Sequence, residues 1–212
     1  MKKLVLGIAS IMVLIGCGTE KRESTDAQLQ KNNSSNSKMI SKGDQEIFKV
    51  KKDSLSSLVW TGSALGKDHF GTVDFEGSLG ASEGKLISGL LIFDMSTINT
   101  QDLVGNSKEK LDNHLKNKDF FNIEKYPSAQ LSIKSFDGKN LIGDLTIKEI
   151  TREITFPASL DIKPNSIIGK AKFTINRTDY GILYGSGSFF DLAKDKVISD
   201  DIDFNVSIKA VQ

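Results

Sequence analysis

Residues 129–147 read AQLSIKSFDGKNLIGDLTI, and this stretch decides the fold class. Apolar Ala129, Leu131 and Ile133 alternate with polar side chains, and apolar residues resume the same alternation after the central FDGKN. A period of two is typical of a strand that buries one face. The Asp-Gly pair in FDGKN favours a tight turn between two strands. The stretch therefore predicts an antiparallel hairpin.

The same period of two dominates the chain from about residue 47 onward, with turn signals between the alternating runs. Short connections leave little room for crossover helices, so the pattern indicates an antiparallel sandwich or barrel. The alternating apolar positions outside the hairpin are Leu58, Trp60, Val73, Phe75, Leu91, Phe93, Met95, Ile154, Phe156, Ala171, Phe173, Ile175, Ile202, Phe204, Val206 and Ile208.

One segment breaks the alternation. Residues 106–121 (NSKEKLDNHLKNKDFF) place Leu111 and Leu115 four positions apart, with lysines around them. This spacing predicts a single helix of about three turns between two strands. Asn106 or Ser107 is the expected N-cap, because short polar side chains accept hydrogen bonds from the first free backbone N–H groups. Because it joins two strands, we expect this helix to cover one mouth of a barrel.

The composition excludes several classes of protein. The chain has 212 residues, 38% hydrophobic and 26% charged, which rules out a wholly disordered chain, a collagen and a polytopic membrane protein. A net charge of +1 gives no field to attract nucleic acid. One Cys and two His allow no intramolecular disulfide and no closed zinc site. We therefore expect no cofactor and no nucleic-acid partner; the oligomeric state is left open.

The N-terminus predicts an export signal. Lys2 and Lys3 precede an apolar run that is too short to span a bilayer and ends in LIGC. This ending resembles the bacterial lipobox, which predicts cleavage before Cys17 and lipidation of its sulfur; an ordinary signal peptide with a chance Cys is the alternative. Gly18, rather than Asp, after the Cys favours the outer membrane of the cell envelope and leaves the periplasmic or surface face open.

These signals predict three segments. Residues 1–16 are the lipoprotein signal peptide, 17–45 are the lipidated Cys and a flexible tether, and 46–212 are the barrel domain. The tether is rich in Lys, Glu, Ser, Asn and Gln, a composition that buries too little apolar surface to offset the entropy lost on ordering.

Few residues offer catalytic chemistry. The chain has no G-x-S-x-G elbow, phosphate-binding Walker motif, HExxH or CxxC. His69, in an expected Gly-flanked turn, and His114, on the expected helix, have structural roles or form a weak metal site with carboxylates. Asp200 and Asp201 are expected at a solvated strand start. The apolar stripes are the extended functional candidate, and we expect no enzyme.

Several motifs now support a resemblance. The chain from about residue 47 is similar to the YceI-like family of bacterial envelope proteins, most closely over residues 111–133, LDNHLKNKDFFNIEKYPSAQLSI. Residues 141–160 and 173–191, with VWTG and KDHFG near the start, follow the family pattern in order. Departures from the commoner family residues occur at Asn117, Asn122, Leu131 and Glu149.

The resemblance implies an all-β, lipocalin-like, eight-stranded antiparallel barrel with one short helix between strands. It also implies binding of a long apolar molecule, such as a polyisoprenoid or amphiphilic lipid, inside the barrel, and it supplies no catalytic residues. The better-preserved family positions, with structural or ligand-facing roles, are Trp60, His69, His114, Asp119, Phe120, Phe121, Tyr126, Pro127, Arg177 and Tyr180.

The alternating apolar pattern and the family resemblance both indicate that the barrel interior is the functional site. An eight-stranded barrel has room for packed side chains or one slim ligand, so the inward stripe either lines a cavity or fills the core. The candidate lining residues are Trp60, Leu91, Phe93, Leu131, Ile133, Phe156, Phe173 and Phe204. Arg177, Tyr180 and His114 are candidates for the mouth, where Arg177 either pairs with Asp179 or holds an anionic head group.

Three functions compete. The leading hypothesis is non-catalytic binding or carriage of a polyisoprenoid or other lipid by a barrel anchored to the membrane. The second is a filled, ligand-free barrel that binds a protein partner in the envelope or the stress response. The third is an enzyme or cofactor protein that uses His69 or His114, which the sequence supports least.

Overall fold

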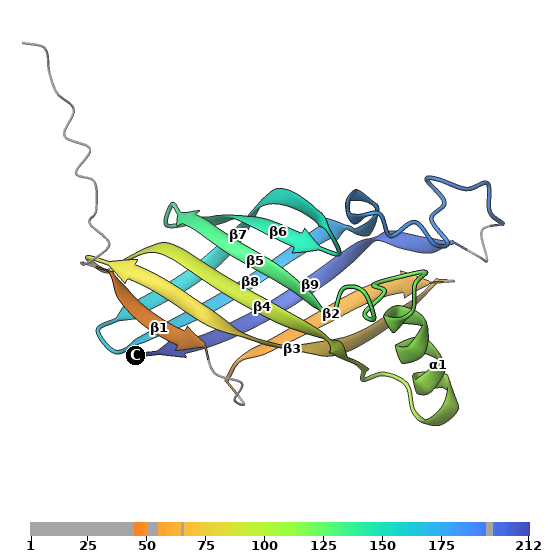
Figure 1. Ribbon diagram of the computed structural model, residues 1–212, viewed down its shortest axis with the longest axis horizontal. Helices are drawn as coiled ribbons and strands as arrows, with labels where there is room; N and C mark the ends of the chain where they lie inside the picture. Colours follow the sequence, from red (N-terminus) through yellow and green to blue (C-terminus); the bar gives the residue numbers. More distant parts are fainter. Residues whose placement is uncertain (1–44, 51–54, 65, 194–196) are drawn as a thin grey trace, which may run out of the picture. The chain divides into compact units, whose positions relative to one another are not determined.

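The alternating stretches form long strands in the computed structural model (Figure 1), which describes residues 45–50, 55–64, 66–193 and 197–212. The described elements are, in chain order, β1 (Glu46–Val50), β2 (Ser57–Ala64), β3 (Lys67–Ser82), β4 (Lys85–Thr100), α1 (Gly105–Lys116), β5 (Ser128–Phe136), β6 (Asn140–Ile147), β7 (Ile150–Lys163), β8 (Ser166–Asn176), the 3-10 helix η1 (Arg177–Tyr180) and β9 (Ile198–Val211).

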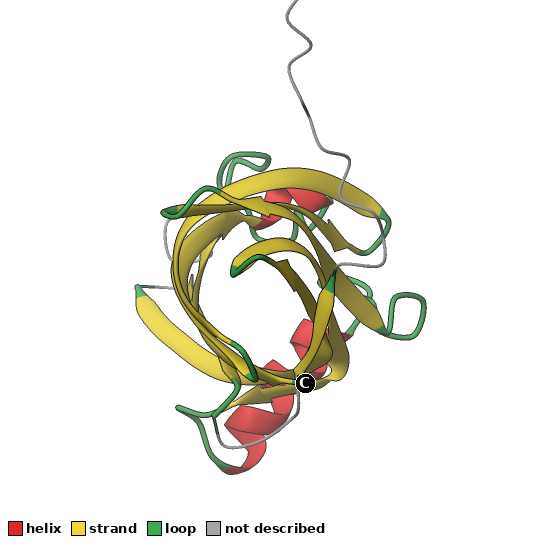
Figure 2. Ribbon diagram, turned by 90° about the vertical axis from the view of Figure 1, so that its left-hand side faces the viewer, coloured by secondary structure: helices red, strands yellow, loops and turns green. Residues whose placement is uncertain are grey.

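The sheet closes on itself. Antiparallel pairing runs from β3 through β4 and each following strand to β9, and from β9 through β2 back to β3 (Figure 2). β1 and β2 share one position, because both pair with β3 and β9 at different heights. The nine described strands therefore fill eight positions, which confirms the predicted eight-stranded antiparallel barrel with one helix.

The β5–β6 hairpin forms as its sequence predicts. Gly138 adopts a φ of +96°, and the Asp137 carboxylate accepts backbone N–H groups of Lys139 at 2.8 Å and Asn140 at 2.6 Å. Leu131 on β5 pairs with Leu145 on β6, and both side chains are buried. The turn, together with a register shift between Ile133 and Ser135, sets the pairing that directs both apolar stripes into the barrel.

The helix differs from its prediction at both ends. It starts at Gly105, whose φ is +56°, and Val104 at the N-cap makes no side-chain capping bond, so the expected cap at Asn106 or Ser107 is wrong. It stops at Lys116 because the Asn117 side chain accepts the Asp119 N–H at 2.8 Å and holds the chain in a turn.

The barrel has two different ends (Figure 1). The β3–β4, β5–β6 and β7–β8 turns lie at one end with β1 and the C-terminus. The connections that contain α1 and η1 lie at the other, which we call the helical end. His69 lies here on β3, so the expected Gly-flanked turn is wrong: the β2–β3 connection is only residues 65–66.

The predicted signal peptide, Cys17 and all of the predicted tether before Gln45 lie outside the described residues. Among those described, β1 begins at Glu46. The one α-helix in this part of the chain, α1, has neither the length nor the hydropathy that crossing a bilayer requires.

Candidate ligand-binding site

The barrel encloses a central apolar cavity of about 60 Å³. Six of the eight predicted lining residues surround it: Leu91, Phe93, Leu131, Ile133, Phe156 and Phe173. The rest of its wall, which was not among the predicted lining residues, is Leu58, Leu79, Leu86, Leu141, Ala158, Leu160, Gly169, Lys170, Ala171, Val206 and Ile208. Nearly every group that faces this space is apolar, so the cavity favours hydrocarbon over water.

A second cavity, of about 80 Å³, lies at the helical end. Trp60, the seventh predicted residue, lines this mouth cavity rather than the central one, and so do the mouth candidates His114 and Arg177. The remaining wall comes from β2, β3, α1 and β9, with one residue from the loop after α1: Gly62, Ser63, Ala64, His69, Leu111, Leu115, Phe120, Ile198, Ser199 and Ile202.

Phe204, the eighth predicted residue, borders neither of the two cavities. On β9 it lies between the inward-facing Val206 of the central cavity and Ile202 of the mouth cavity. It pairs with Trp60 across β2–β9 and stacks on Phe173 with ring centroids 5.3 Å apart. Phe173 in turn stacks on Phe156 at 4.1 Å. The three rings thus form an aromatic ladder across β7, β8 and β9.

The position of Trp60 depends on a glycine. Gly71 pairs with Trp60 across β2–β3, and a Cβ at Gly71 would lie 2.6 Å from Trp60 Cζ2 and 2.3 Å from the Asn99 carbonyl oxygen. Both distances are too short for non-bonded atoms, so any larger residue at position 71 displaces the indole or the β4 backbone. Gly71 therefore gives the indole room at the wall of the mouth cavity.

Both cavities are small. Pockets for small molecules commonly have volumes of about 300–1,000 Å³. The central cavity of about 60 Å³ and the mouth cavity of about 80 Å³ fall well below this range. A long chain therefore enters only if interior side chains change rotamer, and Phe204, between Ile202 and Val206 on β9, is the first candidate for such a change.

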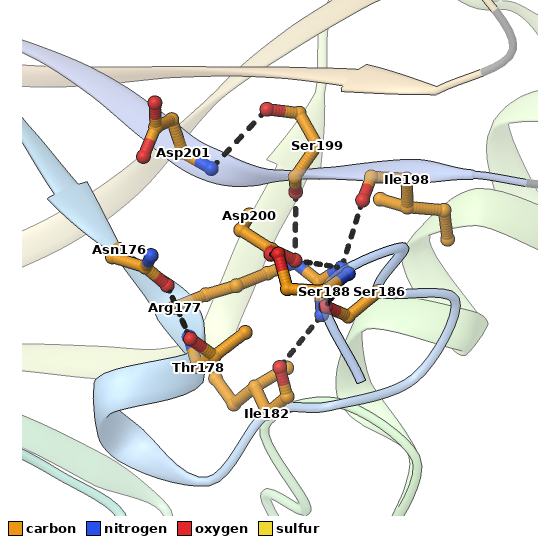
Figure 3. Close-up of polar contacts among 10 residues, drawn as sticks. All are labelled: Asn176, Arg177, Thr178, Ile182, Ser186, Ser188, Ile198, Ser199, Asp200 and Asp201. Carbon is orange, nitrogen blue, oxygen red and sulfur yellow. Dashed lines mark hydrogen bonds and ion pairs between the residues drawn. The ribbon is translucent and has the colours of Figure 1, made fainter. Parts of the chain in front are cut away.

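Arg177 is fully buried and lines the mouth cavity. Figure 3 shows its polar contacts. Its Nε donates to the Ser199 carbonyl at 2.8 Å, Nη1 to Ile182 at 2.6 Å and Nη2 to Ile198 at 3.0 Å. Nη2 also lies 3.2 Å from the Asp200 carboxylate. Burial lowers the pKa of the guanidinium, and the charge of Asp200 opposes that shift. The ion-pair partner is thus Asp200 rather than the expected Asp179.

This pairing also corrects the placement of Asp200. Its side chain is only 14% exposed, and its second oxygen accepts the Ser188 hydroxyl at 2.6 Å (Figure 3). Asp200 is therefore part of a buried network and not the solvated strand start expected from its Asp-rich neighbourhood. Arg177 uses its charge and most of its donors inside the fold, which leaves little for an anionic head group.

The two remaining mouth candidates, Tyr180 and His114, are packed among neighbouring side chains. Of these, Tyr180 lines neither cavity. It is buried, and burial together with the nearby Asp179 raises its pKa to about 12, so it stays protonated. His114 packs edge-to-face on Phe120 and Tyr184, with ring centroids 5.0 and 4.7 Å away. These contacts place the histidine in an aromatic cluster beside the mouth cavity.

His69 also lines the mouth cavity, and its Nδ1 is 2.7 Å from Asp102. Burial opposes a lower pKa for Asp102, but hydrogen bonds from His69 and the Phe70 backbone N–H outweigh it and lower the pKa. Across the described ranges, no group of three or more His, Cys, Asp or Glu side chains is arranged to hold a metal ion.

Comparison with known proteins agrees with this geometry. The family model described as the YceI-like domain matches residues 48–210, which is most of the chain. The chain belongs to the YceI-like family. The UPF0312 protein SA2479 of Staphylococcus aureus (strain N315) is 33% identical to this YceI-like chain over 123 residues, covering 53% of this chain and 68% of that protein.

Two solved structures share the fold of this YceI-like barrel. Burkholderia cenocepacia BcnA superposes with a TM-score of 0.59 at 16% identity, covering 74% of this chain and 96% of its own. A polyisoprenoid binding domain from Saccharophagus degradans, described as implicated in plant cell wall breakdown, gives 0.59 at 15% identity, covering 78% and 99%. At these identities the likeness establishes the fold.

Sequence reasoning missed two kinds of site residue in the YceI-like barrel. Leu58, Leu160 and Val206 line the central cavity but were not among the predicted lining residues; Leu58 and Val206 were already alternating apolar positions, and the same period of two could have found Leu160. Asp102 and Asp200 have no such signal, because their partners His69 and Arg177 are 33 and 23 positions away in the chain.

Proposed function

We propose that the barrel binds and carries a long apolar ligand, a polyisoprenoid or another lipid, without catalysing a reaction on it. The observation that carries the proposal is the interior itself: two apolar cavities follow one another along the inward stripes of the strands. The Saccharophagus degradans domain, which shares this fold, is described as polyisoprenoid binding and supports the same ligand class.

The energetics suit a hydrocarbon. Removing one CH₂ group from water is worth about 0.8 kcal/mol, so one five-carbon isoprene unit gives about 3–4 kcal/mol before ordering costs. A nine-residue strand such as β5 extends over about 30 Å, enough for an extended chain of several units. Burial alone thus supports binding without any ionic contact.

Carriage requires a place in the cell, and we propose the envelope. In this proposal Cys17 is lipidated after cleavage of residues 1–16, and the tether holds the barrel near a membrane. The outer membrane is favoured. Radiolabelled palmitate incorporated into the wild-type chain but not into Cys17→Ala would support the anchor, whereas equal labelling of both would exclude it.

The ligand proposal is tested by native mass spectrometry on the protein purified from a bacterial host, followed by extraction with organic solvent. A stoichiometric prenyl or acyl species is the expected result. A mass without ligand that persists after incubation with polyprenols would contradict the proposal.

A pair of variants on β4 locates the site. Phe93 faces the central cavity, whereas its neighbour Ile92 points outward and is 38% exposed. We expect Phe93→Asp to abolish lipid binding and Ile92→Asp to retain it, with Phe173→Asp as a second interior variant. Circular dichroism checks that each variant folds. Full lipid binding by folded Phe93→Asp and Phe173→Asp would refute the cavity assignment.

A second function is favoured by one observation, the small volume of both cavities. A barrel whose aromatic ladder fills the interior would act as a ligand-free interaction module with a protein partner in the envelope or the stress response. The same mass spectra distinguish the two, because this function predicts a protein that stays free of lipid.

A further inference from the structure

The barrel wall between β7 and β8 is paired along only part of its length. Ala158 opposite Ala171 is the last pair of the ladder toward the helical end. Beyond it, residues 150–157 of β7 and 172–176 of β8 have no ladder partner across this side of the wall, and each pairs only with its other neighbour, β6 or β9. We call this unpaired stretch of the wall the β7–β8 seam.

A proline explains where the pairing stops. The Ala158 N–H points toward β6, where it donates to the Lys139 carbonyl at 3.0 Å. Because successive N–H groups of a strand point to opposite sides, the nitrogen of Pro157 points toward β8, opposite Lys172 if the register continued. Proline has no N–H and cannot donate to a ladder. The ladder therefore ends one residue before the position where a donor is missing.

Side chains close the seam where the backbone does not. Phe156 and Phe173, the next inward positions beyond the last ladder pair, stack with ring centroids 4.1 Å apart. At the helical end, Arg152 Nε donates to the Asp179 carbonyl at 3.3 Å, an exposed bond between β7 and η1. Such side-chain contacts can separate without the breaking of a row of backbone hydrogen bonds. The seam is thus a part of the wall that can open while the ladder stays intact.

The seam lies between the solvent and the central cavity. Pro157 and Lys172 border a groove on the outside of the barrel, and its wall also includes Ala158, Lys170 and Ala171. These last three residues border the central cavity as well. Two alanines and the stacked aromatic pair therefore separate the outer groove from the interior. The unpaired part of β8 extends about 16 Å, which exceeds the width of a hydrocarbon chain.

A route through the helical end is more obstructed. Arg177 is fully buried there and bonded to three backbone carbonyls and to Asp200. Phe204 lies along β9 between Ile202 of the mouth cavity and Val206 of the central cavity. A chain that entered at this end would have to pass both, whereas the seam opens on the central cavity itself.

We propose that the apolar ligand enters and leaves the central cavity sideways, through the β7–β8 seam. Pro157 keeps the ladder from extending, and the stacked rings of Phe156 and Phe173 are the gate. This inference rests on the proposed function and names the route to its site. Because the gate is crossed in both directions, closing it slows uptake and release together and leaves the affinity unchanged.

The first test restores the missing donor. Pro157→Thr supplies an N–H toward β8 at an exposed position, so that opening must break one more hydrogen bond. We expect uptake and release of all-trans-retinol, a fluorescent isoprenoid alcohol, each to slow about fivefold with unchanged Kd, as measured by stopped-flow fluorescence. Amide hydrogen exchange shows whether the new N–H is protected. Pro164→Thr, in the exposed β7–β8 turn, is the control and should change neither rate.

A second test closes the seam covalently. Thr155 and Thr174 are exposed and would face each other if the register continued. Thr155→Cys/Thr174→Cys is bridged with bismaleimidoethane, and Ile92→Cys/Gln130→Cys, an exposed pair across the β4–β5 ladder, is bridged as the control. Cys17→Ala in both proteins confines the reaction to the new thiols. We expect the seam bridge to slow uptake and release more than Pro157→Thr does, and the control bridge to change neither.

Unchanged rates in the bridged seam variant would overturn the inference and leave lipid binding intact, because the ligand would then use another route. Equal slowing by the β4–β5 bridge would also overturn it. If the bridge acts and Pro157→Thr does not, the route stands and the role of Pro157 falls. If neither retinol nor a polyprenol binds the wild-type protein, it is the proposed function that fails.

Discussion

The two cavities of this barrel are built in different ways. The central cavity is enclosed by side chains from regular strands, most of them in one alternating phase and almost all apolar. The mouth cavity combines strand residues with α1 and with Arg177, and its polar groups are held by partners far away in the chain. The central cavity thus depends on local pattern, whereas the mouth depends on specific long-range contacts.

The difference has an energetic consequence. Shortening an apolar side chain of the central wall costs the transfer free energy of the lost atoms plus a cavity term, because neighbours relax only partially into the space. The mouth contains a buried ion pair, whose disruption leaves an uncompensated charge. Loss of Arg177 should therefore cost at least as much stability as shortening an equally buried apolar side chain around the centre.

The largest effect is expected for Arg177→Ala. This change removes the partner of the Asp200 carboxylate and of three backbone carbonyls. We expect it to lower the free energy of unfolding by about 3–5 kcal/mol. Urea denaturation measures this. Arg152→Ala is the control, since the Arg152 side chain makes an exposed bond to the Asp179 carbonyl at 3.3 Å. Unchanged stability of Arg177→Ala with lost affinity for charged lipids would instead give Arg177 the head-group role.

The aromatic ladder is tested by Phe204→Ala. Removing this ring from between Phe173 and Trp60 should destabilise the barrel by about 2–4 kcal/mol and enlarge the space inside it. We expect lipid uptake to become faster as stability falls, measured by stopped-flow fluorescence. Phe190→Ala, at a side chain that is 49% exposed, should change neither property. Slower uptake by Phe204→Ala would show that the ring is part of the binding surface and not an obstacle.

The attachment of α1 should depend on pH through Asp112. This carboxylate pairs with Lys108 and accepts the Thr100 N–H at 2.8 Å, which joins the helix to the end of β4. Burial opposes the shift, but the bonds from Lys108 and Thr100 outweigh it and lower the Asp112 pKa.

A carboxylate whose pKa is lower in the folded than in the unfolded protein stabilises the fold at pH values above its unfolded pKa of about 3.9. That contribution to stability is lost as the pH falls through the folded pKa. We therefore expect Asp112→Asn to cost about 1 kcal/mol at pH 6 and much less at pH 2, as measured by urea denaturation at both values. Exposed Asp161, which pairs with exposed Lys163, provides the control variant Asp161→Asn. An equal cost for Asp112→Asn at both pH values would rule out this linkage.

The smallest effect concerns the β6–β7 turn at the helical end. Lys148 adopts a φ of +58°, a conformation in which an L side chain is strained. Lys148→Gly should raise the free energy of unfolding by about 0.5 kcal/mol, because relief of strain exceeds the added entropy of the unfolded chain. Lys139→Gly, at a turn residue whose φ is not positive, should give no gain. A loss of stability in Lys148→Gly would mean that its side chain contributes more than its strain costs.

The central cavity could largely be predicted from the sequence and the mouth could not, for physical reasons. A strand period of two by itself assigns Leu131 and Ile133 to the interior, because successive side chains must point to opposite faces. The same argument places Phe204 inside but cannot show that it borders neither cavity. Its role depends on the rotamers and pairing of Trp60 and Phe173.

Partners at the mouth are set by closure of the barrel. Asp179, two positions from Arg177, is the natural partner by sequence distance, yet β8–β9 pairing brings Ser199 and Asp200 to the guanidinium. The predicted N-cap of α1 fails in the same way: Asn106 and Ser107 have suitable side chains, but Gly105 starts the helix earlier. Local propensity is overridden where tertiary contacts fix the backbone.

The central claim, that a lipid chain lies inside the barrel, is tested most directly by intermolecular NOEs between an isoprenoid ligand and methyl-labelled protein. β4 provides its own control, because Leu91 faces the central cavity while Leu90 points outward and is 40% exposed. We predict NOEs from the ligand to the methyl groups of Leu91 and Leu131 and none to Leu90. NOEs to Leu90 and the outer face of β4, with none to Leu91 or Leu131, would contradict it.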